Sequence, residues 1–178
     1  MYPLAIKIAR MFFLGLMPLL IISSAGHDTE LAPLLAQGTY SLEVEGSPHR
    51  QLKGKIDFSI VSETSQKGHC FSVLKLSFNG REGAVSHEME LVISKENISN
   101  SLPLGKYKVE NVDSFLDSFS GIFGALSSDE MGDKAFFASK GNVRITQCNK
   151  NFVKGTLNLV LEDPVGKKLT IKGIFDAR

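Results

Sequence analysis

The sequence contains no tryptophan, only two cysteines and no run of basic residues. Without tryptophan, the chain lacks the side chain best suited to stacking on sugar rings, which argues against a carbohydrate-binding cleft. Lysine and arginine together number 20 and aspartate and glutamate 19, so the chain is close to neutral. A near-neutral domain without a Lys/Arg run lacks the electrostatic footprint of a nucleic-acid-binding protein, so we predict no nucleic-acid partner.

Motifs that identify a reaction are also missing. Phe119-Ser120-Gly121 lacks the first glycine of a nucleophile elbow. The four histidines have no metal-ligand spacing to one another, and His87 and Glu88 would point to opposite faces of a strand. In the acidic loop at residues 127–133, the spacing of Asp129, Glu130 and Asp133 does not match a calcium-binding loop with its glycine and distal glutamate. The sequence therefore predicts no catalytic residue, no metal and no cofactor.

The one long apolar run, residues 11–22, lies near the N-terminus. Lys7 and Arg10 precede it, and the small residues Ser23, Ser24 and Ala25 follow. This order is typical of a cleavable signal peptide, and the run is shorter than the roughly 20 residues that span a bilayer. We therefore expect an exported protein, periplasmic or secreted, without a stable membrane anchor; an uncleaved anchor is the alternative. The predicted organisation is a signal peptide at residues 1–25, a leader at 26–37 and one β domain at 38–178.

Alternation of apolar and polar residues predicts strands along most of the remaining chain. It is clearest at residues 152–162 and 168–175, where Asp163-Pro164-Val165-Gly166 between them suits a tight turn and predicts an antiparallel hairpin. Asn79-Gly80 is predicted as another hairpin turn. The other predicted strands are residues 38–45, 53–61, 69–78, 85–94, 105–111, 135–139 and 142–148.

A helical period replaces this alternation at residues 113–126. Phe115, Phe119 and Phe123 recur every four residues and would share one helical face. Glycines at positions 121 and 124 weaken this helix by roughly 1 kcal/mol each, so we expect the sheet to support it. The predicted fold is all-β: an antiparallel β-sandwich or up-and-down barrel of about nine strands with one inserted amphipathic helix.

The C-terminal residues 141–178 carry a weak family resemblance. Three short patterns compose it: Gly141-x-Val143-x-Ile145-Thr146, Val153-x-Gly155-Thr156-Leu157 and Ile171-x-Gly173-x-Phe175. This region resembles the C-terminal strands of exported bacterial β-sandwich domains of unknown function. The resemblance implies a β fold and export, and it brings over no functional residue.

The two cysteines, Cys70 and Cys148, are expected to form a disulfide, because an even cysteine count in an exported protein usually means pairing. The strand pattern places them on faces of different character, and either a bulge near Gln147 or a position at the strand end would bring them together. The alternative is a reactive thiol at Cys70, activated by the neighbouring His69.

The function predicted from these features is a non-catalytic binding or interaction module. If the sheet closes into a barrel, apolar side chains could line a cavity for an apolar small molecule, with the helix across one mouth. A dry core, a protein partner without a ligand, and an exported hydrolase with an unrecognised site are the alternatives, and the oligomeric state stays open. The residues predicted to line the cavity are Tyr40, Phe58, Leu74, Met89, Tyr107, Phe115, Phe119, Phe123 and Leu159.

Overall fold

The computed structural model describes residues 35–46, 50–65, 67–96, 104–109 and 120–178. Contacts divide the chain into Met1–Pro33 and Leu34–Arg178, and all described residues belong to the second unit. The predicted signal peptide and most of the predicted leader lie outside the described residues. The strands are β1 Thr39–Glu45, β2 Arg50–Thr64, β3 Cys70–Glu82, β4 Val85–Glu96, β5 Gly105–Lys108, β6 Gly121–Ser128, β7 Gly132–Cys148, β8 Val153–Glu162 and β9 Lys168–Ala177.

Eight of these strands form a closed antiparallel barrel. The order β7-β6-β4-β3-β2-β1-β9-β8 returns to β7 through the β7–β8 pairing, while the short β5 adds to β7 as an extra strand. Neighbours in the barrel are neighbours in sequence except at two places, the step from β4 to β6 past β5 and the pairing of the first strand, β1, with the last, β9. The all-β prediction and its barrel alternative are therefore confirmed.

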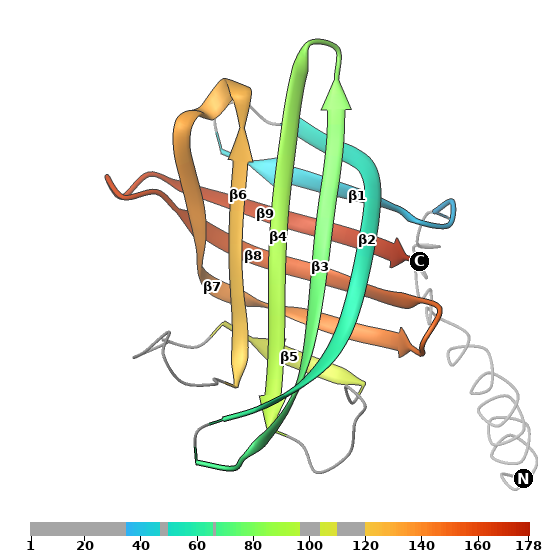
Figure 1. Ribbon diagram of the computed structural model, residues 1–178. Coiled ribbons are helices and arrows are strands. Elements are labelled where there is room, and N and C mark those ends of the chain that lie inside the picture. The colour runs from blue at the N-terminus through green and yellow to red at the C-terminus, as the bar shows by residue number, and fades with distance from the viewer. Residues whose placement is uncertain (1–34, 47–49, 66, 97–103, 110–119) are drawn as a thin grey trace, which may run out of the picture. The chain divides into compact units, whose positions relative to one another are not determined.

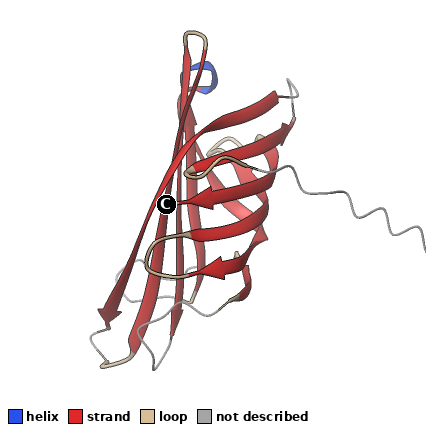
Figure 2. Ribbon diagram, turned by 90° about the vertical axis from the view of Figure 1, so that its right-hand side faces the viewer, coloured by secondary structure: helices blue, strands red, loops and turns tan. Residues whose placement is uncertain are grey.

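The barrel wall has two layers that cross at a steep angle. β2, β3, β4 and β6 make a front layer, and β1, β9, β8 and β7 with β5 make a back layer (Figure 1). Figure 2 shows the two layers after a turn of 90°, with the strands of one layer running at an angle to those of the other. Inward-facing side chains from both layers share this space.

The core is continuous and rich in large side chains. Tyr40 packs edge-on against Phe78 with ring centroids 5.1 Å apart, and Phe78 packs in the same way against Phe175 at 5.9 Å. All three residues are at most 2% exposed. Burial of this apolar surface is the main term that stabilises the barrel.

The predicted helix is wrong over its described part, because residues 121–128 form the strand β6. Ile122 and Leu126 are buried in the core, while Phe123 on the opposite face contacts Phe137 at 6.2 Å between ring centroids. The i, i+4 spacing of the phenylalanines hid this alternation. Phe115 and Phe119, the other residues of the predicted helical face, lie outside the described residues.

The only helix among the described residues is the short 3₁₀-helix η2, Asp129–Met131, which connects β6 to β7. No helix in the described part of the chain is long and apolar enough to cross a bilayer.

β7 merges two predicted strands into one long strand with two register shifts. One shift lies between Ala138 and Lys140, and the other between Ile145 and Gln147, where a bulge was predicted. Because β7 bends, it pairs first with β6 and then with β5 on one side, and with β8 on the other. This strand closes the barrel.

The turn predictions had different outcomes. The β8–β9 hairpin is confirmed, since the amide of Gly166 donates to the carbonyl of Asp163 at 3.0 Å. The Asn79-Gly80 turn is wrong: β3 continues to Glu82 and turns at Gly83, which has φ = 63°. Gly80 is needed for space instead, because a Cβ there would lie 2.3 Å from Nε2 of His87.

The predicted disulfide is also wrong, because both cysteines are free and far apart. Cys70 is exposed at the start of β3, opposite Thr64 in the front layer. Cys148 ends β7, opposite Val153 in the back layer, and is partly buried. Burial raises the pKa of the Cys148 thiol, which makes it less reactive.

Candidate functional site

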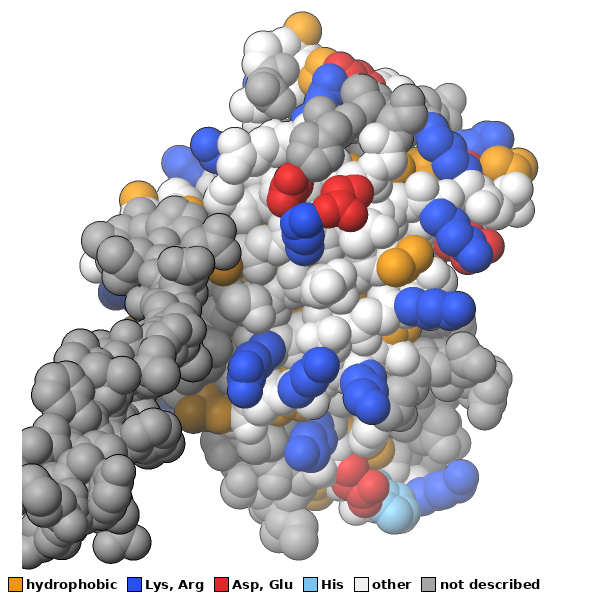
Figure 3. All heavy atoms as spheres, turned by 180° about the vertical axis from the view of Figure 1, so that it is seen from behind, with side chains coloured by type: hydrophobic (Ala, Val, Ile, Leu, Met, Phe, Trp, Pro, Cys, Tyr) orange, Lys and Arg blue, Asp and Glu red, His pale blue; other side chains and the backbone are white. Residues whose placement is uncertain are grey.

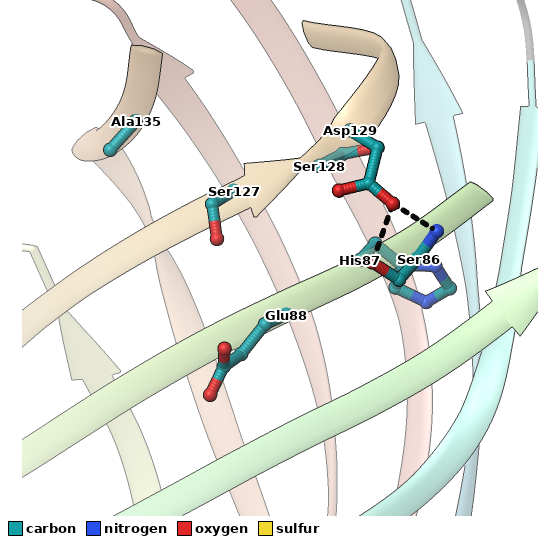
Figure 4. A pocket seen from close by; sticks show the side chains of 7 residues that line it. All are labelled: Ser86, His87, Glu88, Ser127, Ser128, Asp129 and Ala135. Carbon is teal, nitrogen blue, oxygen red and sulfur yellow. Dashed lines mark hydrogen bonds between the residues drawn. The ribbon is translucent and has the colours of Figure 1, made fainter. Parts of the chain in front are cut away.

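An open groove on the outside of the front layer is the candidate site. It has a volume of about 440 Å³ and lies where β4, β6 and the start of β7 meet. A second recess of about 300 Å³ shares Glu88, Ser127 and Ala135 with it and continues along the strands past Glu90. We call the first recess the polar groove; its lining residues are Ser86, His87, Glu88, Ser127, Ser128, Asp129 and Ala135 (Figure 4).

The groove exists because short side chains face long ones across the β4–β6 pair. Glu88 lies directly opposite Ser127, and Glu90 lies directly opposite Ala125. Paired residues on one face of a sheet have Cβ atoms about 5 Å apart, so a small residue leaves the space beside its long partner empty. Glu88 and Glu90 are both exposed. The carboxylates of Glu88 and Glu90 therefore line the second recess.

Asp129 holds one end of the groove together. Its Oδ2 atom accepts hydrogen bonds from the amide of Ser86 at 2.9 Å and from the Ser86 hydroxyl at 2.7 Å. These contacts, drawn in Figure 4, tie η2 to the start of β4. The hydrogen bonds from Ser86, the hydroxyl first, lower the pKa of Asp129, so the carboxylate stays charged and is a weak base.

The side chain of His87 points from β4 into the core of the barrel. It is 6% exposed, and a hydrogen bond of 2.6 Å joins its Nε2 atom to the hydroxyl of Tyr40. The ring lies over Gly80, where no Cβ blocks it. Burial raises the pKa of Tyr40, so this tyrosine is neutral at physiological pH. The pair supports the floor of the groove from inside.

Serine, histidine and aspartate all line the groove, but they are not arranged as a nucleophilic triad. In a triad, histidine lies between the serine and the aspartate and accepts the serine proton. Here the Ser86 hydroxyl donates directly to Asp129, and Nε2 of His87 is bonded to Tyr40. The geometry therefore suits binding of a polar group better than proton transfer from serine.

The other polar residues considered in the sequence are spread over the molecule. A hydrogen bond of 2.5 Å joins Nδ1 of His69 to Oε1 of Glu96. Glu96 is the last residue of β4, whereas His87 lies near the first. Glu130 pairs with Arg50 instead of joining Asp129 at an ion site. Within the described ranges, no group of three or more histidine, cysteine or acidic side chains could hold a metal ion.

The described members of the predicted ligand-binding set do not line either recess. Five of them, Tyr40, Leu74, Met89, Tyr107 and Leu159, are at most 7% exposed and belong to one packed core cluster. Phe58 is partly buried against this core, and Phe123 faces outward on β6. Burial, and then the charge of Cys148, raise the pKa of Tyr107 to about 12. Phe115 and Phe119 are not among the described residues.

Glu88, Glu90, Ala125, Ser127 and Ala135 were not identified from the sequence. The signal was present in the alternation of β4, where the two glutamates share one face. The small partners on β6 were missed because residues 113–126 were assigned to a helix and residues 127–133 to a loop, which removed β6 from the sheet.

Protein-family models, curated proteins and solved structures all give no match to this chain. The resemblance of residues 141–178 to exported β-sandwich domains stays an expectation. The geometry of the groove is therefore the basis for the functional proposal.

Proposed function

We propose that this protein is an exported, non-catalytic binding module whose polar groove takes up a small, positively charged amine. The observation that carries the proposal is the polar groove itself, a recess of about 440 Å³ with an exposed glutamate along it. Recesses of a few hundred Å³ are the usual size of small-molecule sites.

The charges of the groove favour a cationic ligand. Glu88 and Glu90 face the recess from β4, and among the described residues no ion pair with a lysine or arginine neutralises either of them. An ammonium group donates up to three hydrogen bonds, and serine hydroxyls and carboxylates accept them. A carboxylate that bonds to a charged donor gains more than it does from a neutral donor.

The hydrogen bonds of the groove residues also support binding over catalysis. Asp129 is engaged with Ser86 and His87 with Tyr40, so these side chains are fixed before any ligand arrives. Fixed groups lower the entropy cost of binding. An apolar ligand inside the barrel is less favoured, because the residues predicted to surround it pack against one another in the core.

Isothermal titration calorimetry with a panel of mono-, di- and polyamines tests the proposal. The double substitution Glu88→Gln and Glu90→Gln should weaken binding about tenfold, because two charge-assisted hydrogen bonds become neutral ones. Ser127→Leu should abolish binding by filling the recess. A matched control, Asp57→Asn with Glu63→Gln, removes two exposed carboxylates of β2 and should leave the affinity unchanged.

Two results would contradict this assignment. Amine binding that survives Ser127→Leu would place the site elsewhere on the protein. Displacement of a fluorescent fatty acid, unaffected by the groove substitutions, would instead support the apolar small molecule expected from the sequence.

A further inference from the structure

Four basic side chains gather on the outside of the back layer, and none of them lines the polar groove. Lys106 and Lys108 on β5 and Lys140 and Arg144 on β7 are all exposed, and we call them the basic face. Seen from behind, blue side chains group over this layer with no red one among them (Figure 3). The four residues come from two separate segments, so they do not form a continuous Lys/Arg run that could be recognised in the sequence.

The strand register brings these charges close together around Asn142. Lys106 lies directly opposite Arg144, and Lys108 lies directly opposite Asn142. Lys140 and Arg144 are the residues two positions to either side of Asn142 on the same strand, so both are diagonal neighbours of Lys108. Like charges placed directly opposite each other destabilise a sheet. A cluster of this kind costs stability unless something else compensates it.

Lysines on β8 and β9 in the back layer have acidic partners, whereas the cations of the basic face have none among the described residues. Lys172 pairs with Glu43 and Glu45, and Lys154 pairs with Asp176 at 2.8 Å. Among the described residues, no ion pair joins a member of the basic face to an acidic side chain. The basic face therefore offers its charge to a partner outside the described part of the chain.

Exposed apolar side chains flank the basic face. Leu104, which immediately precedes β5, is 60% exposed, and Phe137 on β7 is 43% exposed. Leu104 lies at the Arg144 end of the β5–β7 pair, and Phe137 lies beyond Lys140 at the other end. Cations that surround exposed apolar side chains match a lipid surface, where phosphate headgroups lie above the acyl chains. A nucleic acid would use the charge but not the aliphatic leucine.

We infer that the basic face docks this protein on a membrane surface rich in anionic phospholipids. Each lysine or arginine held near such a surface strengthens binding about fivefold, so four of them suffice for reversible attachment without a spanning segment. The attachment is screened by salt, because exposed charges interact over about 10 Å at 0.1 M ionic strength. The lining of the polar groove comes from β4, β6 and η2 except for Ala135 on β7, so most of the groove lies outside the basic face.

Co-sedimentation of the full chain with vesicles tests this inference. Vesicles of phosphatidylcholine with phosphatidylglycerol should bind the protein more strongly than vesicles of phosphatidylcholine alone, and the difference should fall as salt is raised. The triple substitution Lys106→Gln, Lys108→Gln and Arg144→Gln should reduce the difference on the order of 100-fold. The matched control, Lys53→Gln, Lys55→Gln and Lys75→Gln, removes the same charge from exposed front-layer positions and should retain most of it.

Leu104→Ser separates a lipid surface from other polyanions. It should weaken binding to anionic vesicles about fivefold, because a partly inserted leucine is lost, and leave binding to polyphosphate unchanged. Circular dichroism checks that each variant is folded. Equal losses in the basic-face and control variants, or no preference for anionic vesicles, overturn the inference. Polyphosphate that binds as tightly as the vesicles, with no effect of Leu104→Ser, overturns it in favour of a soluble polyanion.

Discussion

β4–β6 and β5–β7 are both antiparallel strand pairs, but their outward-facing side chains differ in size and in charge. On β4–β6, Glu88 faces Ser127, so a long side chain opposes a short one and a groove opens beside it. On β5–β7, Lys106 faces Arg144, so two long side chains of one charge project together. The residue directly opposite therefore decides whether a strand pair presents a recess or a charged platform.

The two surfaces also rest on different supports. Beneath the groove, the polar pair of His87 and Tyr40 is buried in the core. Beneath the basic face, Val143 and Ile145 are apolar and fully packed, and the backbone of β7 touches β8 at Gly141. The groove thus depends on a hydrogen bond, and the basic face depends on close backbone contact.

The largest effect is expected where β7 approaches β8. Gly141 has φ = 116°, and a Cβ there would lie 2.2 Å from the carbonyl oxygen of Asn158. Gly141→Ala should lower the free energy of unfolding by about 3 to 4 kcal/mol, because strain in φ adds to a backbone overlap. Urea denaturation measures the change.

Gly38→Ala is the control for this prediction. Gly38 also has a positive φ, of 71°, but no atom lies within 4 Å of its Cβ position. Its cost should be only about 1 kcal/mol. Equal losses in the two variants would show that the dihedral angle, and not the contact with β8, limits this part of the barrel.

A smaller loss is expected beneath the groove. Tyr40→Phe removes the hydroxyl that bonds to Nε2 of His87 while keeping the aromatic packing against Phe78. The free energy of unfolding should fall by about 1 to 2 kcal/mol, because a buried polar atom loses a partner. Thermal denaturation measures this change.

The double variant Tyr40→Phe with His87→Leu separates the hydrogen bond from packing. If the bond is responsible, removing both partners should cost less than the sum of the two single substitutions. Strict additivity would show that the two residues contribute independently and that the groove floor does not depend on their bond.

The smallest effect, of opposite sign, is expected at the basic face. Arg144→Gln removes one of two like charges that face each other and should raise the free energy of unfolding by about 0.3 kcal/mol. Lys75→Gln is the control, since Lys75 faces the neutral Ser59 and Val92. Chemical denaturation at low salt should show a gain only for Arg144→Gln, and a gain for both would indicate a general effect of net charge.

The sequence predicted the fold best where local pattern and turn chemistry agreed. The β8–β9 hairpin has alternating residues on both strands, and Asp163 also accepts the amides of Val165 and Lys167 at 3.0 and 2.8 Å. Each local feature there favours the same structure, so the hairpin could be read directly.

Prediction failed where neighbours distant in sequence decide the conformation. Gly124 weakens a helix, but it fits β6 because the side chain of Leu91 on β4 occupies the space where its Cβ would stand. Gly80 was predicted to be a turn residue because the local pattern does not show that the ring of His87 occupies the position of its Cβ. The polar groove and the basic face both depend on cross-strand partners, so neither could be predicted before the register was known.

The pairing of β1 with β9 places the first and last strands of the barrel side by side. Thr39 lies opposite Asp176, so the start of the first strand and the end of the last are adjacent. A short glycine-rich linker can join these positions, and new chain ends can be opened at the exposed turn around Gly83. Such a circular permutant of residues 39–177 keeps all nine strands and both outer surfaces, and its chain ends lie at the β3–β4 turn.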